Sequence, residues 1–265
     1  MRNIIVYGPT ASGKSDFAIN LALKEKGVII NCDSQQIYRE IPIITAQPSS
    51  SDMKKVKHML YGFVDYKEDY NVNRWLEDVA AAIEEVNNSS HVAIIVGGTG
   101  LYINALLNGV HSMPDVSDTR KRQLYQEFMA QDVEDLYERL RQLDGEYAKM
   151  LSLNDRQRIS RALAFCTETG NKYSDFRNSE NVLPKFLEGM QWQKMYLKPD
   201  RVDLYNKINN RFLNMIEGGA IEEVNALYKV LGDDQDYTKA TGVKKIIGYL
   251  KGELTKDEMI KRSQQ

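Results

Sequence analysis

Hydrophobic positions in the first part of the chain fall into three short continuous runs, separated by segments with helical spacing. The runs cover residues 3–7, 28–30 and 92–96, and β-branched side chains predominate in them. Residues 16–26 and 71–87 instead place their apolar side chains on one helical face. Continuous apolar strands that alternate with amphipathic helices are typical of a parallel sheet covered on both faces. The pattern therefore predicts an α/β fold with a parallel sheet flanked by helices.

The composition changes after Gly109. The stretch that follows is rich in Glu, Gln, Arg, Leu and Ala, residue types that favour helices. We therefore predict an all-helical insertion domain at residues 112–196. Residues 1–111 and 197–265 would then form one core that is interrupted in sequence and continuous in space.

The balance of charges limits the classes of partner. Lys+Arg is 35 and Asp+Glu is 37, for a formal net charge of -2, which excludes a uniformly basic nucleic-acid-binding protein but not a locally basic face. The two cysteines, Cys32 and Cys166, are too far apart in sequence for a disulfide framework or a zinc motif. No apolar run has the length of a signal-peptide core or a membrane-spanning helix. These features predict a cytoplasmic protein with no membrane partner.

A complete phosphate-binding motif follows the first predicted strand. It matches the pattern G-x-x-x-x-G-K-[ST] and consists of Gly8, Pro9, Thr10, Ala11, Ser12, Gly13, Lys14 and Ser15. The glycines let backbone N–H groups surround phosphate oxygens at the start of a helix, whose dipole favours an anion. Lys14 supplies a positive charge, and the Ser15 hydroxyl can ligate Mg²⁺. We expect a P-loop-like catalytic core that binds a phosphate or diphosphate, with Mg²⁺ as cofactor.

The usual partner of such a loop is missing. Nucleoside triphosphatases place an aspartate after a second apolar strand to hold the metal, whereas the run at residues 92–96 ends in Gly97-Gly98-Thr99. No N-K-x-D guanine-binding motif occurs either. The motif therefore predicts phosphate binding without the apparatus for hydrolysing a γ-phosphate.

An acidic residue follows the second predicted strand. Asp33 begins the segment Asp-Ser-Gln-Gln-Ile-Tyr-Arg. Because ligand-contacting groups gather at the carboxyl ends of parallel strands, Asp33 should face the same crevice as the phosphate-binding loop. There it could bind a metal or act as a general base, while Gln35 and Gln36 read hydrogen-bonding edges. An ordinary cap of the next helix explains Asp33 equally well at this point.

Several motifs in this order carry a family resemblance. They are GPTASGKS at residues 8–15, DSQQIYR at 33–39, TAQP at 45–48, VGGTGLY at 96–102, NDRQRISRAL at 154–163 and the segment 201–224. Together they resemble the tRNA dimethylallyltransferases, also called tRNA isopentenyltransferases, over nearly the whole chain. The resemblance implies transfer of a dimethylallyl group from dimethylallyl diphosphate to the N6 amine of the adenosine next to the anticodon. It also explains the missing second acid, because the loop would hold a diphosphate leaving group.

The resemblance assigns roles to individual residues. Asp33 would be the general base, and Thr10 and Arg211 would act at the diphosphate beside the P-loop and Mg²⁺. The residues implied in tRNA binding are Asp33, Ser34, Gln35, Gln36, Thr99, Arg122, Gln157, Arg158, Ile159, Ser160 and Arg161. Arg122 is taken from a cluster with Arg120 and Lys121 in which the matching residue is ambiguous. The implied partners are the anticodon stem-loop of tRNA and dimethylallyl diphosphate, for a monomeric enzyme whose family usually continues past Gln265 with a basic, aromatic-bearing segment.

Three other functions stay open. A P-loop kinase for a small metabolite shares the loop and the strand order, and an adenylate isopentenyltransferase would use the same donor on a free nucleotide. An RNA-binding module with a relic P-loop is the non-enzymatic alternative, which intact Lys14, Ser15 and Asp33 oppose. A kinase would use ATP, whereas the two transferases would use dimethylallyl diphosphate. The transferases differ in whether label from that donor appears in tRNA or in AMP.

Overall fold

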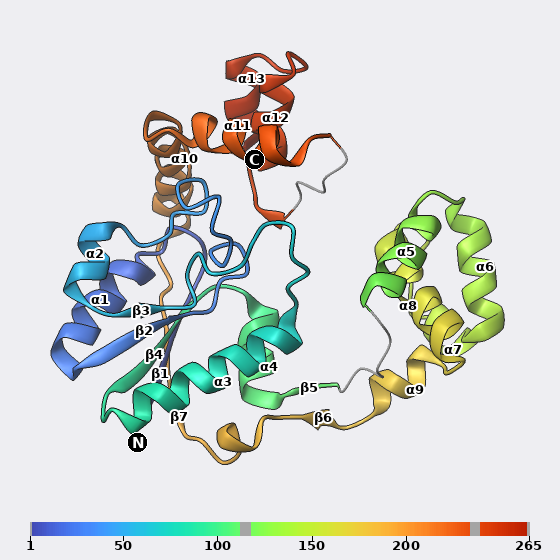
Figure 1. Ribbon diagram of the computed structural model, residues 1–265, viewed down its shortest axis with the longest axis horizontal. Coiled ribbons are helices and arrows are strands. Elements are labelled where there is room, and N and C mark those ends of the chain that lie inside the picture. The colour runs from blue at the N-terminus through green and yellow to red at the C-terminus, as the bar shows by residue number, and fades with distance from the viewer. Residues whose placement is uncertain (1, 112–117, 234–238, 264–265) are drawn as a thin grey trace. The chain divides into compact units, whose positions relative to one another are not determined.

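The computed structural model describes residues 2–111, 118–233 and 239–263 and divides the chain into two compact units (Figure 1). The first unit combines Met1–Leu107 with Leu183–Gln265, and the second is Asn108–Val182. The predicted insertion at residues 112–196 therefore extends too far at its carboxyl end. Residues 183–196 belong to the first unit because they include a strand of its sheet. No helix among the described residues is long and apolar enough to cross a membrane.

The first unit is built on a parallel sheet of five strands. The strands are β1 (Asn3–Tyr7), β2 (Gly27–Asn31), β3 (His58–Met59), β4 (Val92–Gly97) and β7 (Trp192–Tyr196), in the order β3-β2-β4-β1-β7. In the centre, Ile30 pairs with Ile95 and Ile95 with Ile5, and none of these three is more than 1% exposed. The structure thus confirms the predicted α/β fold and its three apolar strands.

Helices cover both faces of the sheet. The first unit contains α1 (Lys14–Glu25), α2 (Ser50–Lys55), α3 (Val72–Asn88), α4 (Gly100–Asn108), the 3₁₀ turn η1 (Lys185–Leu187), α10 (Arg201–Glu217), α11 (Ala220–Leu231), α12 (Val243–Leu250) and α13 (Lys256–Ser263). Helix α1 packs against Ile4, Val6 and Ile94. Because side chains alternate along a strand, the neighbouring residues Ile5 and Ile95 point to the opposite face, against which α3 packs.

The carboxyl-terminal helices α10 to α13 form a separate hydrophobic cluster with residues 37–44 and 64–66, irregular parts of the connection after β2. Its buried residues include Ile41 from that connection, Phe212 from α10 and Val243 from α12. The long connection after β2 is therefore fixed by burial although it contains little regular structure.

The second unit is mainly helical. It contains β5 (Val110–His111), α5 (Asp118–Met129), α6 (Val133–Leu143), α7 (Gly145–Ala148), α8 (Arg156–Thr169), α9 (Tyr173–Asn178) and β6 (Asn181–Val182). Leu136, Leu140 and Leu163 are completely buried in its core. The two short strands pair antiparallel, Val110 with Val182, and bring the ends of the inserted segment together. An insertion closed in this way leaves the sheet of the first unit uninterrupted.

Candidate active site

The glycine-rich loop lies at the carboxyl end of β1 and leads directly into α1. Gly13 caps α1 with φ 84° and ψ 17°, a left-handed conformation that glycine adopts without steric cost. At Gly8 a Cβ would lie 2.5 Å from the carbonyl oxygen of Leu197, which follows β7. These two glycines are thus required by backbone conformation and by close packing, and the loop leads into the start of α1, where an anion is favoured.

Two polar side chains of this loop, those of Lys14 and Ser12, are partly or fully buried. Lys14 Nζ donates hydrogen bonds to the carbonyl oxygens of Gly8, at 3.0 Å, and Pro9, at 2.6 Å. Burial lowers the pKa of Lys14, and the charge of Asp33 opposes that shift. Ser12 Oγ is buried and has no hydrogen-bond partner among the residues that the structure describes. A buried donor of this kind fits an anionic oxygen as its partner, whereas Thr10 and Ser15 are exposed at the mouth of the loop.

Asp33 follows β2 and belongs to the same end of the sheet. Its Oδ1 accepts a hydrogen bond from the backbone N–H of Gln35 at 2.9 Å. Its backbone N–H donates to Asn31 Oδ1 at 2.9 Å, and its carbonyl oxygen accepts from Asn31 Nδ2 at 3.0 Å. Burial raises the pKa of Tyr61 and Tyr102, and the nearby charge of Asp33 raises both further. Asp33 is therefore a carboxylate among aromatic side chains rather than a surface helix cap.

Arg211 reaches this site from α10, far along the chain. It is half-buried, and its Nη2 donates to the Thr45 carbonyl oxygen at 3.4 Å. Burial lowers the pKa of Arg211, and Asp33 acts in the opposite direction. The charge of Arg211 also lowers the pKa of Lys14, after the larger effect of burial. Two cations and one carboxylate thus interact at the carboxyl end of the sheet.

Thr99 joins the Asp33 segment to the end of β4. Its Oγ1 accepts a hydrogen bond from the Ser34 backbone N–H at 3.0 Å and lies 3.4 Å from Ser34 Oγ. Gln35 exchanges two hydrogen bonds with Thr241, and Gln36 Nε2 donates to the Thr45 and Ala46 carbonyl oxygens. The three residues that follow Asp33 are thus each held by a hydrogen bond to another segment of the chain.

An open pocket of about 500 Å³ lies beside the loop. It is lined by Tyr7, Gly8, Pro9, Gly98, Gly100, Ile103, Asn104, Leu107 and Tyr196. No group of three or more His, Cys, Asp or Glu side chains in the described part of the chain could hold a metal ion. The Ser15 hydroxyl, together with water and phosphate oxygens, is a donor set that Mg²⁺ accepts.

Comparison with known proteins places these residues in a family. A family model described as IPP transferase matches residues 36–265, and one described as isopentenyl transferase matches residues 1–65. A tRNA dimethylallyltransferase from Rhizobium etli is 37% identical over 260 residues, which cover 98% of this chain and 87% of that protein. One from Wolbachia sp. subsp. Drosophila simulans is 42% identical over 264 residues, with the same shares of the two chains. The chain belongs to the IPP transferase family.

Solved structures of related proteins have the same fold as this chain. A eukaryotic dimethylallyltransferase acting on tRNA superposes with a TM-score of 0.79 at 26% identity, covering 100% of this chain and 66% of that one. The tRNA isopentenylpyrophosphate transferase of Bacillus halodurans has a TM-score of 0.63 at 29% identity, covering 99% and 82%. The fold described above is therefore the fold of the IPP transferases.

In this IPP transferase, the sequence-predicted RNA residues of the second unit divide into two groups. Gln157, Arg158 and Arg161 on α8 are exposed. Ile159 and Ser160 are completely buried in the core of the unit, so their side chains anchor α8, and their assignment to tRNA binding stays a prediction. The helical period explains the difference, because successive residues point in different directions around the axis. Arg158 forms an ion pair with Asp155 at 3.7 Å.

The basic cluster at the start of α5 is described in part. Arg120 Nε donates to Glu168 Oε2 at 3.3 Å, which ties α5 to α8. The side chains of Lys121 and Arg122 lie outside the described residues. The prediction that Arg122 binds tRNA therefore stays a prediction.

One residue of the site was not predicted from the sequence. Asn31 is the last residue of β2, is 0% exposed, and makes two hydrogen bonds to the backbone of Asp33. The available signal was a polar amide directly after the apolar run 28–30, at a position where a further apolar residue would be usual.

Proposed function

We propose that this chain transfers a dimethylallyl group from dimethylallyl diphosphate to the N6 amine of the adenosine next to the anticodon of tRNA, releasing diphosphate. The observation that carries the proposal is the convergence of Lys14, Asp33 and Arg211, from α1, from the segment after β2 and from α10, at one end of the sheet. Membership of the IPP transferase family supports the reaction class. The proposed reaction needs cations for a diphosphate and a carboxylate for an amine proton, and these three residues supply both.

The loop at residues 8–15 would hold the diphosphate. Its backbone N–H groups and the start of α1 favour the anion, and Ser12 Oγ offers a buried hydroxyl that lacks a partner among the described residues. Lys14 and Arg211 would offset the negative charge that grows on the leaving group as the C–O bond breaks. Thr10 would donate to the oxygen at the breaking bond. A Mg²⁺ ion held by Ser15 and the diphosphate would supply further charge neutralisation.

Asp33 would accept the proton of the adenine amine as the nitrogen attacks the allylic carbon. A neutral adenine amine is a weak nucleophile, so alignment with the donor carbon and with the base contributes much of the rate. The reaction requires the adenine to leave the base stack of the anticodon loop. Ser34, Gln35, Gln36 and Thr99 surround the carboxylate and would line the entrance to the site. The exposed Arg158 and Arg161 would contact the RNA backbone, in a monomeric enzyme working in the cytoplasm.

The test incubates the protein with labelled dimethylallyl diphosphate and either unmodified tRNA or AMP. Label in tRNA supports the proposal, whereas label in AMP favours an adenylate isopentenyltransferase. Phosphate transfer from ATP favours a kinase, and tRNA binding without labelling in any arm favours an RNA-binding module.

A substitution then tests the base. Asp33→Asn should lower turnover by about 100-fold or more, as expected for loss of a general base. Inhibition by inorganic diphosphate should not weaken, because the substitution removes a negative charge beside Lys14 and Arg211. Asp52→Asn on the exposed helix α2 is the matched control. Near-normal turnover of Asp33→Asn would remove Asp33 as the base.

A further inference from the structure

Asn31 is a buried polar side chain that directly follows the apolar run of β2. It is the last residue of β2 and is 0% exposed. Its Oδ1 accepts from the Asp33 backbone N–H at 2.9 Å, and its Nδ2 donates to the carbonyl oxygens of Asp33 and Leu60, each at 3.0 Å. Both ends of the amide are thus satisfied, which a buried polar group requires.

These bonds restrain the backbone on both sides of Asp33. One holds the peptide group that precedes the aspartate, and the other holds the peptide group that follows it. Asp33 Oδ1 is in turn occupied by the Gln35 N–H at 2.9 Å. Oδ2 of Asp33 accepts no hydrogen bond from the residues that the structure describes. Of the two carboxylate oxygens, Oδ2 is therefore the one left to accept a proton.

Asn31 is itself held by a residue in the first turns of α3. Its backbone carbonyl oxygen accepts a hydrogen bond from Trp75 Nε1 at 3.2 Å, and Trp75 is 0% exposed. The Trp75 ring stacks on Tyr102, with the ring centres 4.3 Å apart and the planes 18° from parallel. A buried indole fixed on both sides is a rigid support.

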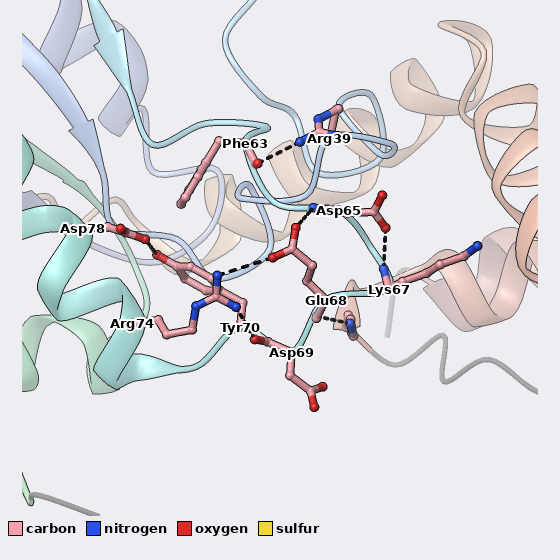
Figure 2. Close-up of polar contacts among 10 residues, drawn as sticks. Arg39, Phe63, Asp65, Lys67, Glu68, Asp69, Tyr70, Arg74 and Asp78 are labelled. Carbon is pink, nitrogen blue, oxygen red and sulfur yellow. Dashed lines mark hydrogen bonds and ion pairs between the residues drawn. The ribbon is translucent and has the colours of Figure 1, made fainter. Parts of the chain in front are cut away.

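The start of α3 is anchored by the polar network in Figure 2. The Tyr70 hydroxyl donates to Asp78 Oδ2 at 2.6 Å, and Arg74 Nη1 donates to the Asp69 carbonyl oxygen at 2.7 Å. Asn71 caps the helix by accepting from the N–H groups of Asn73 and Arg74. Trp75 directly follows this anchored turn, so the same contacts that fix the start of α3 also fix the indole that binds Asn31.

We propose that Asn31 is a positioning residue that aims the Asp33 carboxylate at the adenine amine. The proposal rests on the proposed function, in which the N6 nitrogen bonds to the allylic carbon, the C–O electron pair leaves with the diphosphate, and the N6 proton moves to Asp33. Asn31 touches none of the reacting atoms. It acts by holding Asp33 where Oδ2 meets that proton, and displacement of such a group by about 1 Å costs about 100-fold in rate.

The test is a double-mutant cycle between Asn31→Ala and Asp33→Asn, with kcat and KM measured for both substrates. Asn31→Ala should lower kcat about 10- to 100-fold and leave both KM values within about twofold. In the Asp33→Asn background the same substitution should change the residual rate less than about twofold, because no base remains to be aimed. Asn31→Ser, which keeps one hydrogen bond, should be intermediate and serves if the alanine variant does not fold.

Asn3→Ala is the matched control. Asn3 is also a buried strand asparagine, 1% exposed, but it lies at the amino end of β1, and its Oδ1 has no partner among the described residues. Its replacement should leave kcat unchanged. If Asn31→Ala lowers kcat by the same factor with and without Asp33, Asn31 only maintains the fold. That result would overturn the role inferred for Asn31 and leave the proposed function standing. Full activity of Asp33→Asn would refute the assigned base itself and the inference with it.

Discussion

Gly97, the last residue of β4, offers a quantitative test of how closely the strands behind the site approach each other. A Cβ at this position would lie 2.0 Å from the Cys32 carbonyl oxygen and 2.2 Å from its carbon. Real Cβ contacts essentially never fall below 3.0 Å. The neighbouring group is backbone, and Cys32 is 1% exposed, so no side-chain rotation relieves the contact. Gly97→Ala must therefore push the ends of β4 and β2 apart by about 1 Å.

The magnitude follows from that displacement. The hydrogen bond from the Cys32 N–H to the Val96 carbonyl oxygen is 2.8 Å long, and a shift of this size breaks it. Its loss costs about 1 kcal/mol, and overpacking of a buried site costs a further 1–3 kcal/mol, roughly. Alanine also lowers the conformational entropy of the unfolded chain, which raises the free energy of unfolding by about 0.5 kcal/mol. We expect Gly97→Ala to lower the free energy of unfolding by about 2 kcal/mol or more.

Urea unfolding monitored by circular dichroism measures this loss, with Gly100→Ala as the control. Gly100 is three residues along the chain, at the start of α4, and a Cβ there meets nothing within 4 Å. That variant should unfold within about 0.5 kcal/mol of the parent. Turnover should also fall in Gly97→Ala, because Cys32 directly precedes Asp33. A change below about 0.5 kcal/mol in Gly97→Ala would refute the argument from close approach.

Two further predictions concern the second unit. Burial raises the pKa of Asp144, but hydrogen bonds from the Tyr147 N–H and from the N–H and hydroxyl of Ser174 outweigh burial, so the pKa lies below its usual value. A carboxyl whose pKa is lowered in the folded state stabilises the fold when the pH is above the pKa of the unfolded state. The free energy of unfolding at pH 7, measured with urea, should therefore be about 2 kcal/mol higher for the parent protein than for Asp144→Asn. That advantage should shrink as pH falls below about 4, and an advantage that grew there would contradict the assignment. Replacing Arg158 and Arg161 together by Gln should lower the slope of log Kd for tRNA against log salt concentration by about 1.5. The control variant, Arg141→Gln with Lys149→Gln, removes the same charge from the second unit and should leave that slope nearly unchanged. Equal slopes for the two double variants would remove Arg158 and Arg161 as phosphate contacts.

Local signals were sufficient for most of the core. The strands at residues 3–7 and 92–96 and the helix at 71–87 appear where hydrophobic periodicity predicts them, because each buries a continuous apolar surface of its own. The edge strand β7 escaped prediction since Gln193 and Lys194 are exposed and an edge strand needs no continuous apolar run. For the same reason the boundary of the insertion was placed at residue 196 instead of 182.

The sequence alone determined the phosphate-binding loop, the acid after the second strand and the family, since each is defined by short motifs whose residues are close together in the chain, and the family by the order of several such motifs. Only the tertiary structure decided how the site is assembled. It brings Arg211 into the range of Asp33 and shows that the Leu197 backbone leaves no room for a side chain at Gly8. It also shows the hydrogen bonds by which Asn31 holds Asp33. These relations depend on packing between distant segments, and hydrophobic periodicity within one segment carries no information about them.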